Sequence, residues 1–357
     1  MRVLFVDFTT GLKTVDDLQT GGRGGMVTSL FRVPDALSQL GIQTSVFSDI
    51  LQGGQSGNTA WYTVEEYETV ANVAWDFIVF NRGIGNLLPE FKAKHRILWT
   101  HDLVHGGFAR NPQHLKALSA TVFMSKYAER IWRLYYRQIG RSFIIPNGVD
   151  KDIFYPREKD LDYMIFISAP NRGLKRLPPI FETVRQRFNG RPLRLVAYSN
   201  MKVLHPKDTS VNDGADDIYS PIYEDAIAQG VDVRDPVPQP KLAEELGRAG
   251  MMVLPTGYPE ICSNAVLQSL ASGTPIITTG NMGSACEWVK HRWNGILTKT
   301  HLEDYAIHMM EIMRGVAEVL ADEKLHRRLI RNAAKTKGIY TWKEIGKRWK
   351  TMLDRLY

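Results

Sequence analysis

The chain has 357 residues, a length that favours two domains of ordinary size, and its 44% hydrophobic and 23% charged residues are close to an ordinary globular composition. Two cysteines, Cys262 and Cys286, are too few for a disulfide scaffold and suit a reducing cytoplasm. The net charge of +7 favours anionic partners such as nucleotide diphosphates, acidic lipid headgroups or nucleic acid, without choosing among them.

The amino-terminal residues lead straight into a strand-like segment over 2–7, with no signal-peptide pattern before it. No apolar run approaches the ~20 residues that are needed to span a bilayer. We therefore expect a cytoplasmic protein, soluble or peripheral at the inner membrane face.

Short apolar strands alternate with helical patterns along the first half of the chain. A Gly-rich stretch over 20–25 precedes a helix expected over 26–40, which ends at Gly41. Strands are expected over 3–7, 44–47, 76–80, 96–100, 120–124 and 143–145. This alternation predicts an α/β domain with a parallel sheet.

The second half restarts the same pattern after a polar stretch over 150–161, which we interpret as the linker. Strands are expected over 163–168, 193–198, 251–254 and 275–278, with helices over 180–188, 239–248 and 264–271 and a mostly helical tail over 302–357. The sequence thus predicts two α/β domains, each binding ligands beyond the carboxyl ends of its strands, with a cleft between them.

Two polar motifs follow predicted strands of the first half. The stretch Thr20–Gly25 offers close backbone approach and a helix N-terminus to an anion. His101, Asp102 and His105 follow the strand over 96–100; they could ligate a metal, but their spacing matches no strong metal signature, and a structural histidine is the alternative.

A basic turn follows the first strand of the second half, in the segment Ser168-Ala169-Pro170-Asn171-Arg172-Gly173-Leu174-Lys175-Arg176. A strand, a tight turn and a helix start that carries Arg and Lys suit a diphosphate leaving group. A merely solvated helix start would place these cations at the unfavourable end of the helix dipole, so we favour the functional interpretation.

The most specific motif runs over 259–279. Glu260 lies in a turn, Gln268 follows eight residues later on a predicted helix, and Gly273-Thr274-Pro275 leads into a short apolar strand. With the basic turn, this motif resembles the nucleotide-sugar signature of retaining glycosyltransferases of the GT-B fold, especially family 4. The resemblance implies two Rossmann-like domains, 1–155 with a final helix at 341–357 and 156–340.

The resemblance implies a nucleotide diphosphate sugar as the donor and names residues for it. Glu260 would contact the transferred sugar, Arg172 and Lys175 the diphosphate, and His101 would reach the donor sugar from the first domain. The remaining donor-binding residues would be Gly24, Gly25, Ile261, Cys262, Ser263, Asn264 and Gln268. Family members have Glu at position 268, so Gln268 implies weaker ribose binding. Asp102 and Arg23 would lie on the acceptor side.

By the same resemblance, the leaving phosphate takes the acceptor proton, and neither a metal nor another cofactor is expected. The acceptor would be a surface glycan or a lipid-linked sugar; a modified base of phage DNA and a non-catalytic nucleotide-sugar-binding subunit stay open as alternatives. The basic, aromatic segment over 125–137 could contact an anionic membrane or nucleic acid, although a solvated helix explains it as well.

Overall fold

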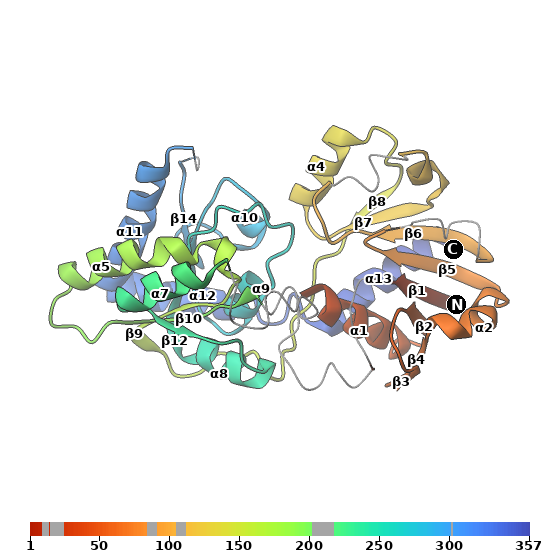
Figure 1. Cartoon of the computed structure of the whole chain (residues 1–357), viewed down its shortest axis with the longest axis horizontal. Coiled ribbons are helices and arrows are strands. Elements are labelled where there is room, and N and C mark those ends of the chain that lie inside the picture. Colours follow the sequence, from red (N-terminus) through yellow and green to blue (C-terminus); the bar gives the residue numbers. More distant parts are fainter. Residues whose placement is uncertain (9–13, 15–24, 84–90, 105–111, 202–217, 301–302) are drawn as a thin grey trace. The chain divides into compact units, whose positions relative to one another are not determined.

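The computed structural model describes residues 1–8, 14, 25–83, 91–104, 112–201, 218–300 and 303–357. The chain divides into two compact units. Unit 1 comprises Met1–Gly148 and Tyr340–Tyr357, and unit 2 comprises Val149–Ile339. Each unit is a sheet with helices packed against it (Figure 1).

Unit 1 contains an eight-stranded sheet of order β3-β4-β2-β1-β5-β6-β7-β8. Its strands are β1 (Arg2–Asp7), β2 (Gln43–Ser48), β3 (Gly54–Ser56), β4 (Thr59–Tyr62), β5 (Trp75–Asn81), β6 (Ala93–Trp99), β7 (Ala120–Phe123) and β8 (Ser142–Ile144). Its helices are α1 (Gly25–Ser38), α2 (Tyr67–Ala71), α4 (Lys126–Tyr135) and α13 (Trp342–Leu356), with the 3-10 turns η2 (Val64–Glu66) and η3 (Pro112–Ala117). Strands β3 and β4 pair antiparallel, and the other strand pairs of the described residues are parallel.

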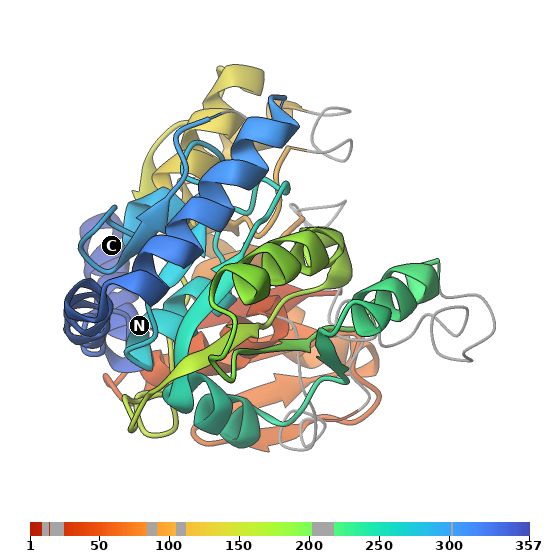
Figure 2. The ribbon, with the colours of Figure 1, turned by 90° about the vertical axis from the view of Figure 1, so that its left-hand side faces the viewer.

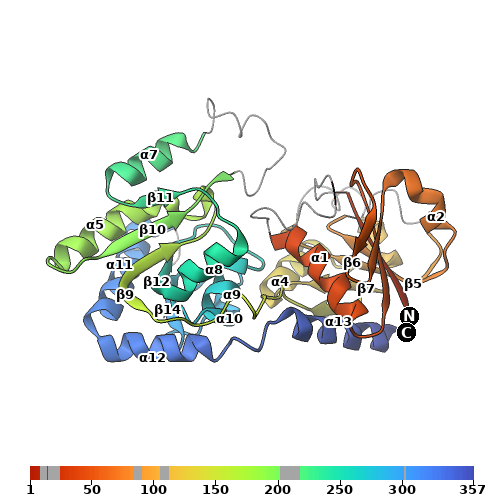
Figure 3. The same ribbon diagram turned by 90° about the horizontal axis from the view of Figure 1, so that it is seen from below.

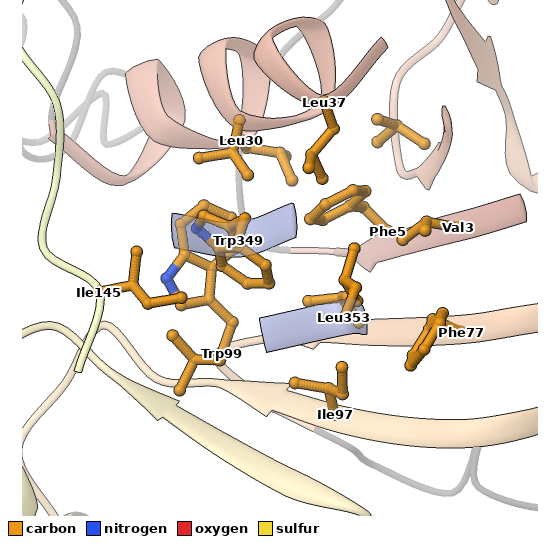
Figure 4. Packing of buried hydrophobic residues seen from close by; sticks show 14 of the residues in the cluster. Val3, Phe5, Leu30, Leu37, Phe77, Ile97, Trp99, Ile145, Trp349 and Leu353 are labelled. Carbon is orange, nitrogen blue, oxygen red and sulfur yellow. The ribbon is translucent and has the colours of Figure 1, made fainter. Parts of the chain in front are cut away.

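The core of unit 1 joins residues from both ends of the sequence (Figure 4). Trp349 of α13 is fully buried, and its ring lies 6.0 Å from Phe5 of β1 and 5.0 Å from Trp99 of β6, measured between ring centroids. Helix α13 also packs on α1, where a Cβ on Gly346 would lie 2.8 Å from the Cβ of Ala36. The final helix therefore completes the amino-terminal unit, as the fold prediction required.

Unit 2 contains a six-stranded parallel sheet of order β11-β10-β9-β12-β13-β14. Its strands are β9 (Asp160–Phe166), β10 (Arg194–Tyr198), β11 (Asp232–Arg234), β12 (Ala249–Leu254), β13 (Ile276–Thr278) and β14 (Gly295–Leu297). Its helices are α5 (Leu177–Arg187), α7 (Ser220–Ala228), α8 (Gln239–Arg248), α9 (Asn264–Ala271), α10 (Ala285–Trp288), α11 (Tyr305–Ala321) and α12 (Glu323–Ala334), with the 3-10 turns η4 (Pro170–Arg172) and η5 (Leu174–Arg176).

Two groups of helices cover the sheet of unit 2. Helix α5 contacts α7 and α11, and α9 contacts α8 and α12. Figure 2 shows α5 and α11 on the side that faces the viewer, and Figure 3 shows α8 and α9 on the side of the sheet away from α5. The expected α/β architecture of two parallel-sheet domains is confirmed.

A partly buried lysine joins the start of β9 to the helices α8 and α9. The ammonium group of Lys159 donates to the carbonyl oxygens of Leu246 and Ser272, at 3.1 and 2.9 Å, and to the hydroxyl of Thr274 at 2.5 Å. Both carbonyls lie at helix C-termini, where the helix dipole favours a cation. Burial nevertheless lowers the pKa of Lys159 to about 7.

The strands expected from the apolar runs are all present, and the short strands β3, β4, β11 and β14 are additional. Among the helices of the described residues, none combines the length and the apolar character that crossing a membrane would require.

Candidate active site

The basic turn of unit 2 is held against the segment that follows β12. The turns η4 and η5 meet at Gly173, whose φ of 125° lies in the region that favours glycine. A Cβ on Gly173 would approach the carbonyl oxygen of Pro255 to 2.7 Å, so a larger residue would push the two segments apart. Gly173 thereby fixes the backbone position from which the Arg172 side chain extends.

The turn that carries Glu260 is fixed by its own backbone hydrogen bonds. The amide of Glu260 donates to the carbonyl of Tyr258 at 2.9 Å, and its carbonyl accepts from the amide of Ser284 at 2.8 Å. Gly283 has a φ of 69°, and a Cβ there would lie 3.0 Å from the Glu260 amide nitrogen and carbonyl oxygen. Two loops at the carboxyl ends of β12 and β13 therefore position this carboxylate.

These two turns bring Arg172 and Glu260 together. Nη1 of Arg172 lies 3.6 Å from Oε1 of Glu260, and the Arg172 guanidinium carbon lies 3.2 Å from the centroid of the Tyr258 ring. The two charged side chains are only 16% and 17% exposed, so their interaction is screened less than that of a surface pair.

The contact is an ion pair rather than a hydrogen bond, because 3.6 Å exceeds the usual N–H···O range. Nη1 of Arg172 is shielded from solvent and has no hydrogen-bond partner within the described residues. The site thus combines a guanidinium with unused donor capacity and a carboxylate, groups that suit an anionic oxygen and a hydroxyl respectively.

Lys175 is the second cation predicted for the diphosphate. It lines a cavity of about 390 Å³ together with Arg176, and neither Arg172 nor Glu260 belongs to the lining of that cavity. The structure therefore places the two predicted cations in different surroundings.

The residues after Glu260 lead into α9. Ile261 and Ser263 are buried, whereas Cys262 and Asn264 are partly exposed at the start of the helix. Gln268 is also partly exposed, and its Nε2 donates to Oε1 of Gln239, the first residue of α8, at 3.1 Å. The partner of Gln268 is thus another amide, which sequence reasoning missed because α8 lies far away along the chain.

The predicted residues of unit 1 are described only in part. Gly25 begins α1, whereas Arg23, Gly24 and His105 lie outside the described residues. The His101 ring packs on Trp99, with 4.5 Å between the centroids. Burial, aided by the nearby Arg82, lowers the pKa of His101 to about 3 against the opposing charge of Asp102.

His101 is therefore neutral at pH 7. Its Nε2 is shielded from solvent and has no hydrogen-bond partner among the described residues. A neutral imidazole with one unused ring nitrogen can donate to or accept from a hydroxyl, depending on the tautomer, but it is a weak base.

Asp102 is held by an arginine that sequence reasoning missed. Nε and Nη2 of Arg82 donate to Oδ2 and Oδ1 of Asp102 at 2.5 and 2.7 Å, and the Asp102 carboxylate raises the pKa of Arg82. Arg82 adopts a φ of 65°, an uncommon conformation for a residue other than glycine. The sequence feature that could have pointed to Arg82 is its position, because Asn81-Arg82 directly follows the apolar strand expected over 76–80.

Three comparisons with known proteins bear on this site. The family model of the glycosyl transferases group 1 matches residues 216–336, which contain Glu260 and Gln268. No curated protein sequence matches the chain significantly.

Among solved structures, the chain resembles sucrose-phosphate synthase from Thermosynechococcus elongatus, with 16% identity and a TM-score of 0.72 over 100% of this chain and 99% of that one. It also resembles Anabaena HepE in complex with UDP and glucose, with 12% identity and a TM-score of 0.67 over 99% and 100%. A third similar structure is WaaG, a glycosyltransferase involved in lipopolysaccharide biosynthesis, with 12% identity and a TM-score of 0.68 over 98% and 99%.

At these identities the structural likeness shows the fold. The chain has the GT-B fold, with two units each built on a Rossmann-like sheet. The family match over part of unit 2 adds support for a glycosyltransferase of the group 1 type.

Proposed function

We propose that this protein is a retaining glycosyltransferase that moves a sugar from a nucleotide diphosphate donor to a hydroxyl of an acceptor. The observation that carries the proposal is the Arg172–Glu260 pair beside Tyr258, at the carboxyl end of the sheet in unit 2. The complexes of Anabaena HepE with UDP and with UDP-glucose support a nucleotide sugar as the donor.

In this proposal the donor separates the ion pair. The Arg172 guanidinium binds the diphosphate and stabilises the negative charge that grows on it as the bond to the sugar breaks. Glu260, released from Arg172, accepts a hydrogen bond from a hydroxyl of the transferred sugar. We assign the diphosphate to Arg172 and propose no divalent metal, because a cationic side chain can itself offset the charge of the leaving group.

The proposed retention of configuration rests on the state of the two candidate bases in unit 1. A direct displacement with inversion needs a general base for the acceptor hydroxyl. Both oxygens of Asp102 are engaged by Arg82, and burial lowers the pKa of His101 to about 3. Neither group is a good base at pH 7, so we propose that the leaving phosphate takes the acceptor proton on the face from which it departs.

On the acceptor side we propose a hydroxyl of a surface glycan or a lipid-linked sugar, next to unit 1. The unused Nε2 of His101 forms a hydrogen bond with a sugar hydroxyl. The ion pair of Asp102 with Arg82 joins the segments that follow β6 and β5 and so holds the backbone next to His101.

Incubation with a panel of UDP-, GDP-, ADP- and dTDP-sugars tests the proposal. We expect slow hydrolysis of one donor, and Glu260→Gln should reduce it strongly because the neutral amide accepts a weaker hydrogen bond than the carboxylate. Glu323→Gln is the matched control, since Glu323 is an exposed residue of α12 in the same unit.

NMR of the anomeric proton then shows whether the released sugar keeps the configuration of the donor. A product of inverted configuration would refute the retaining mechanism, and binding of a nucleotide sugar without any turnover would refute the enzymatic proposal.

A further inference from the structure

The cavity beside Lys175 is lined by two cations and by no carboxylate of the described residues. Its lining contains Lys175, Arg176, Asn171, Ile222, Gly257 and Tyr305, with Pro170 and Gly173. None of these residues is acidic. Neither Lys175 nor Arg176 forms an ion pair with any residue that the structure describes.

Arg176 is held in place without being neutralised. Its Nη1 donates to the carbonyl of Pro255 at 2.8 Å, and its guanidinium carbon lies 5.5 Å from the centroid of the Tyr305 ring. A carbonyl and a ring face orient the guanidinium but bring no negative charge. Burial lowers the pKa of Arg176, the direction expected for a partly desolvated cation without an anionic partner.

The segment that follows β12 contacts both arginines of the basic turn. Its Pro255 carbonyl and Gly257 face Arg176, and a Cβ on Gly257 would lie 2.5 Å from Nη2 of that arginine. The next residue, Tyr258, turns its ring to Arg172 instead. The cavity thus lies on the side of the basic turn that faces α7 and α11, two of the helices on the near side in Figure 2.

We propose that this cavity binds a phosphate group, separately from the donor. Arg176 and Lys175 would bind the phosphate oxygens, and the Asn171 amide would add a further donor. The volume of about 390 Å³ exceeds what one phosphate needs and is typical of small-molecule sites, so the natural ligand carries an organic part. Ile222 and the half-exposed Tyr305 offer that part an apolar and an aromatic surface. In this assignment Lys175 serves the second site rather than the diphosphate of the donor.

Calorimetric titration of the full chain with inorganic phosphate and with phenyl phosphate tests the proposal. We expect both probes to bind, and the double substitution Lys175→Gln with Arg176→Gln should weaken both by about tenfold or more, the effect of losing a charge-assisted hydrogen bond. Tyr305→Ala should weaken phenyl phosphate and leave inorganic phosphate unchanged, which separates the phosphate group from the organic part.

Three further variants test whether the phosphate probes bind in this cavity. Lys175→Gln alone removes an exposed side chain that makes no ion pair within the described residues, so it should weaken phosphate binding without unfolding the chain even if Arg176→Gln proves unstable. Lys324→Gln, an exposed lysine of α12, is the matched control and should change nothing. Arg172→Gln should leave intact the phosphate binding that depends on Lys175 and Arg176.

Equal phosphate binding by the wild type and the Lys175 and Arg176 variants would overturn the proposal. Loss of binding in Arg172→Gln alone would also overturn it, because the probe would then occupy the proposed donor site. Turnover of the nucleotide sugar is measured separately, so a failure of this proposal is distinct from a failure of the proposed activity.

Discussion

Replacing Arg172 with methionine keeps most of the apolar stem and removes the guanidinium. The change deletes the ion pair with Glu260 at 3.6 Å and the contact with Tyr258 at 3.2 Å. A cation over an aromatic ring contributes about 0.5–2 kcal/mol, and a partly exposed ion pair adds up to about 1 kcal/mol. We therefore expect a free energy of unfolding lower by about 1–2 kcal/mol and a folded protein.

The expected effect on turnover is larger. A charge-assisted hydrogen bond to the diphosphate contributes about 1.5–3 kcal/mol, which corresponds to about a 10–150-fold loss in kcat/KM. Arg172→Lys keeps the charge but loses the planar contact with the ring and the second donor, so its kcat/KM should fall between the wild type and Arg172→Met. Arg185→Met is the matched control, because Arg185 pairs with Glu182 on an exposed face of α5.

Initial rates at subsaturating donor, with thermal unfolding of each variant, check this prediction. An unchanged kcat/KM in Arg172→Met, with the fold intact, would refute the assignment of the diphosphate to this residue. A loss of the same size in Arg185→Met would show that the effect is not specific to the site.

Glu260→Gln should cost more activity than Gln268→Ala, because we propose that Glu260 meets the reacting sugar and expect Gln268 to meet only the distant ribose; steady-state kinetics with the reverse order would contradict this assignment. Burial lowers the pKa of Lys159 to about 7 from an ordinary 10.5, so between these values the unfolded chain holds a proton that the folded chain lacks. The free energy of unfolding should therefore rise with pH across that window, and Lys159→Met should lose this rise in urea titrations at several pH values. His101 stays neutral above about pH 3, so His101→Gln should alter the rate but not the shape of the pH–rate profile between pH 5 and 8; a titration step that disappears in the variant would contradict this. EDTA should leave the rate unchanged, and a loss that Mg²⁺ restores would contradict the proposed charge balance.

The fold could be predicted from sequence because its buried strands are continuous apolar runs that alternate with helices. The apolar runs of β5 and β12 predict these strands, because parallel strands are covered on both faces and are therefore apolar on both. The edge strand β11 has one apolar residue between Asp232 and Arg234, so it shows no apolar run and was missed.

The candidate site was predictable where its parts are close in sequence. Glu260 and Arg172 each stand in a turn after an apolar strand, and that position points to them. Their partners were not predictable, because Tyr258 reaches Arg172, and Arg82 reaches Asp102, only through the packing of separate strands in the sheets. The sequence alone can point to a polar residue at the end of a strand, whereas the partner of that residue depends on how the strands pack in the fold.

The position of α13 bears on how the chain folds. Ile345, Trp349, Met352 and Leu353 of this helix lie in the buried core of unit 1, whose other buried members precede residue 149. All of unit 2 is therefore synthesised between the two parts of that core. A nascent chain exposes the apolar surface around Phe5 and Trp99 until α13 leaves the ribosome, while the contiguous unit 2 can already fold. Chaperone binding should accordingly concentrate on unit 1 during translation, and unit 2 should acquire protease resistance first.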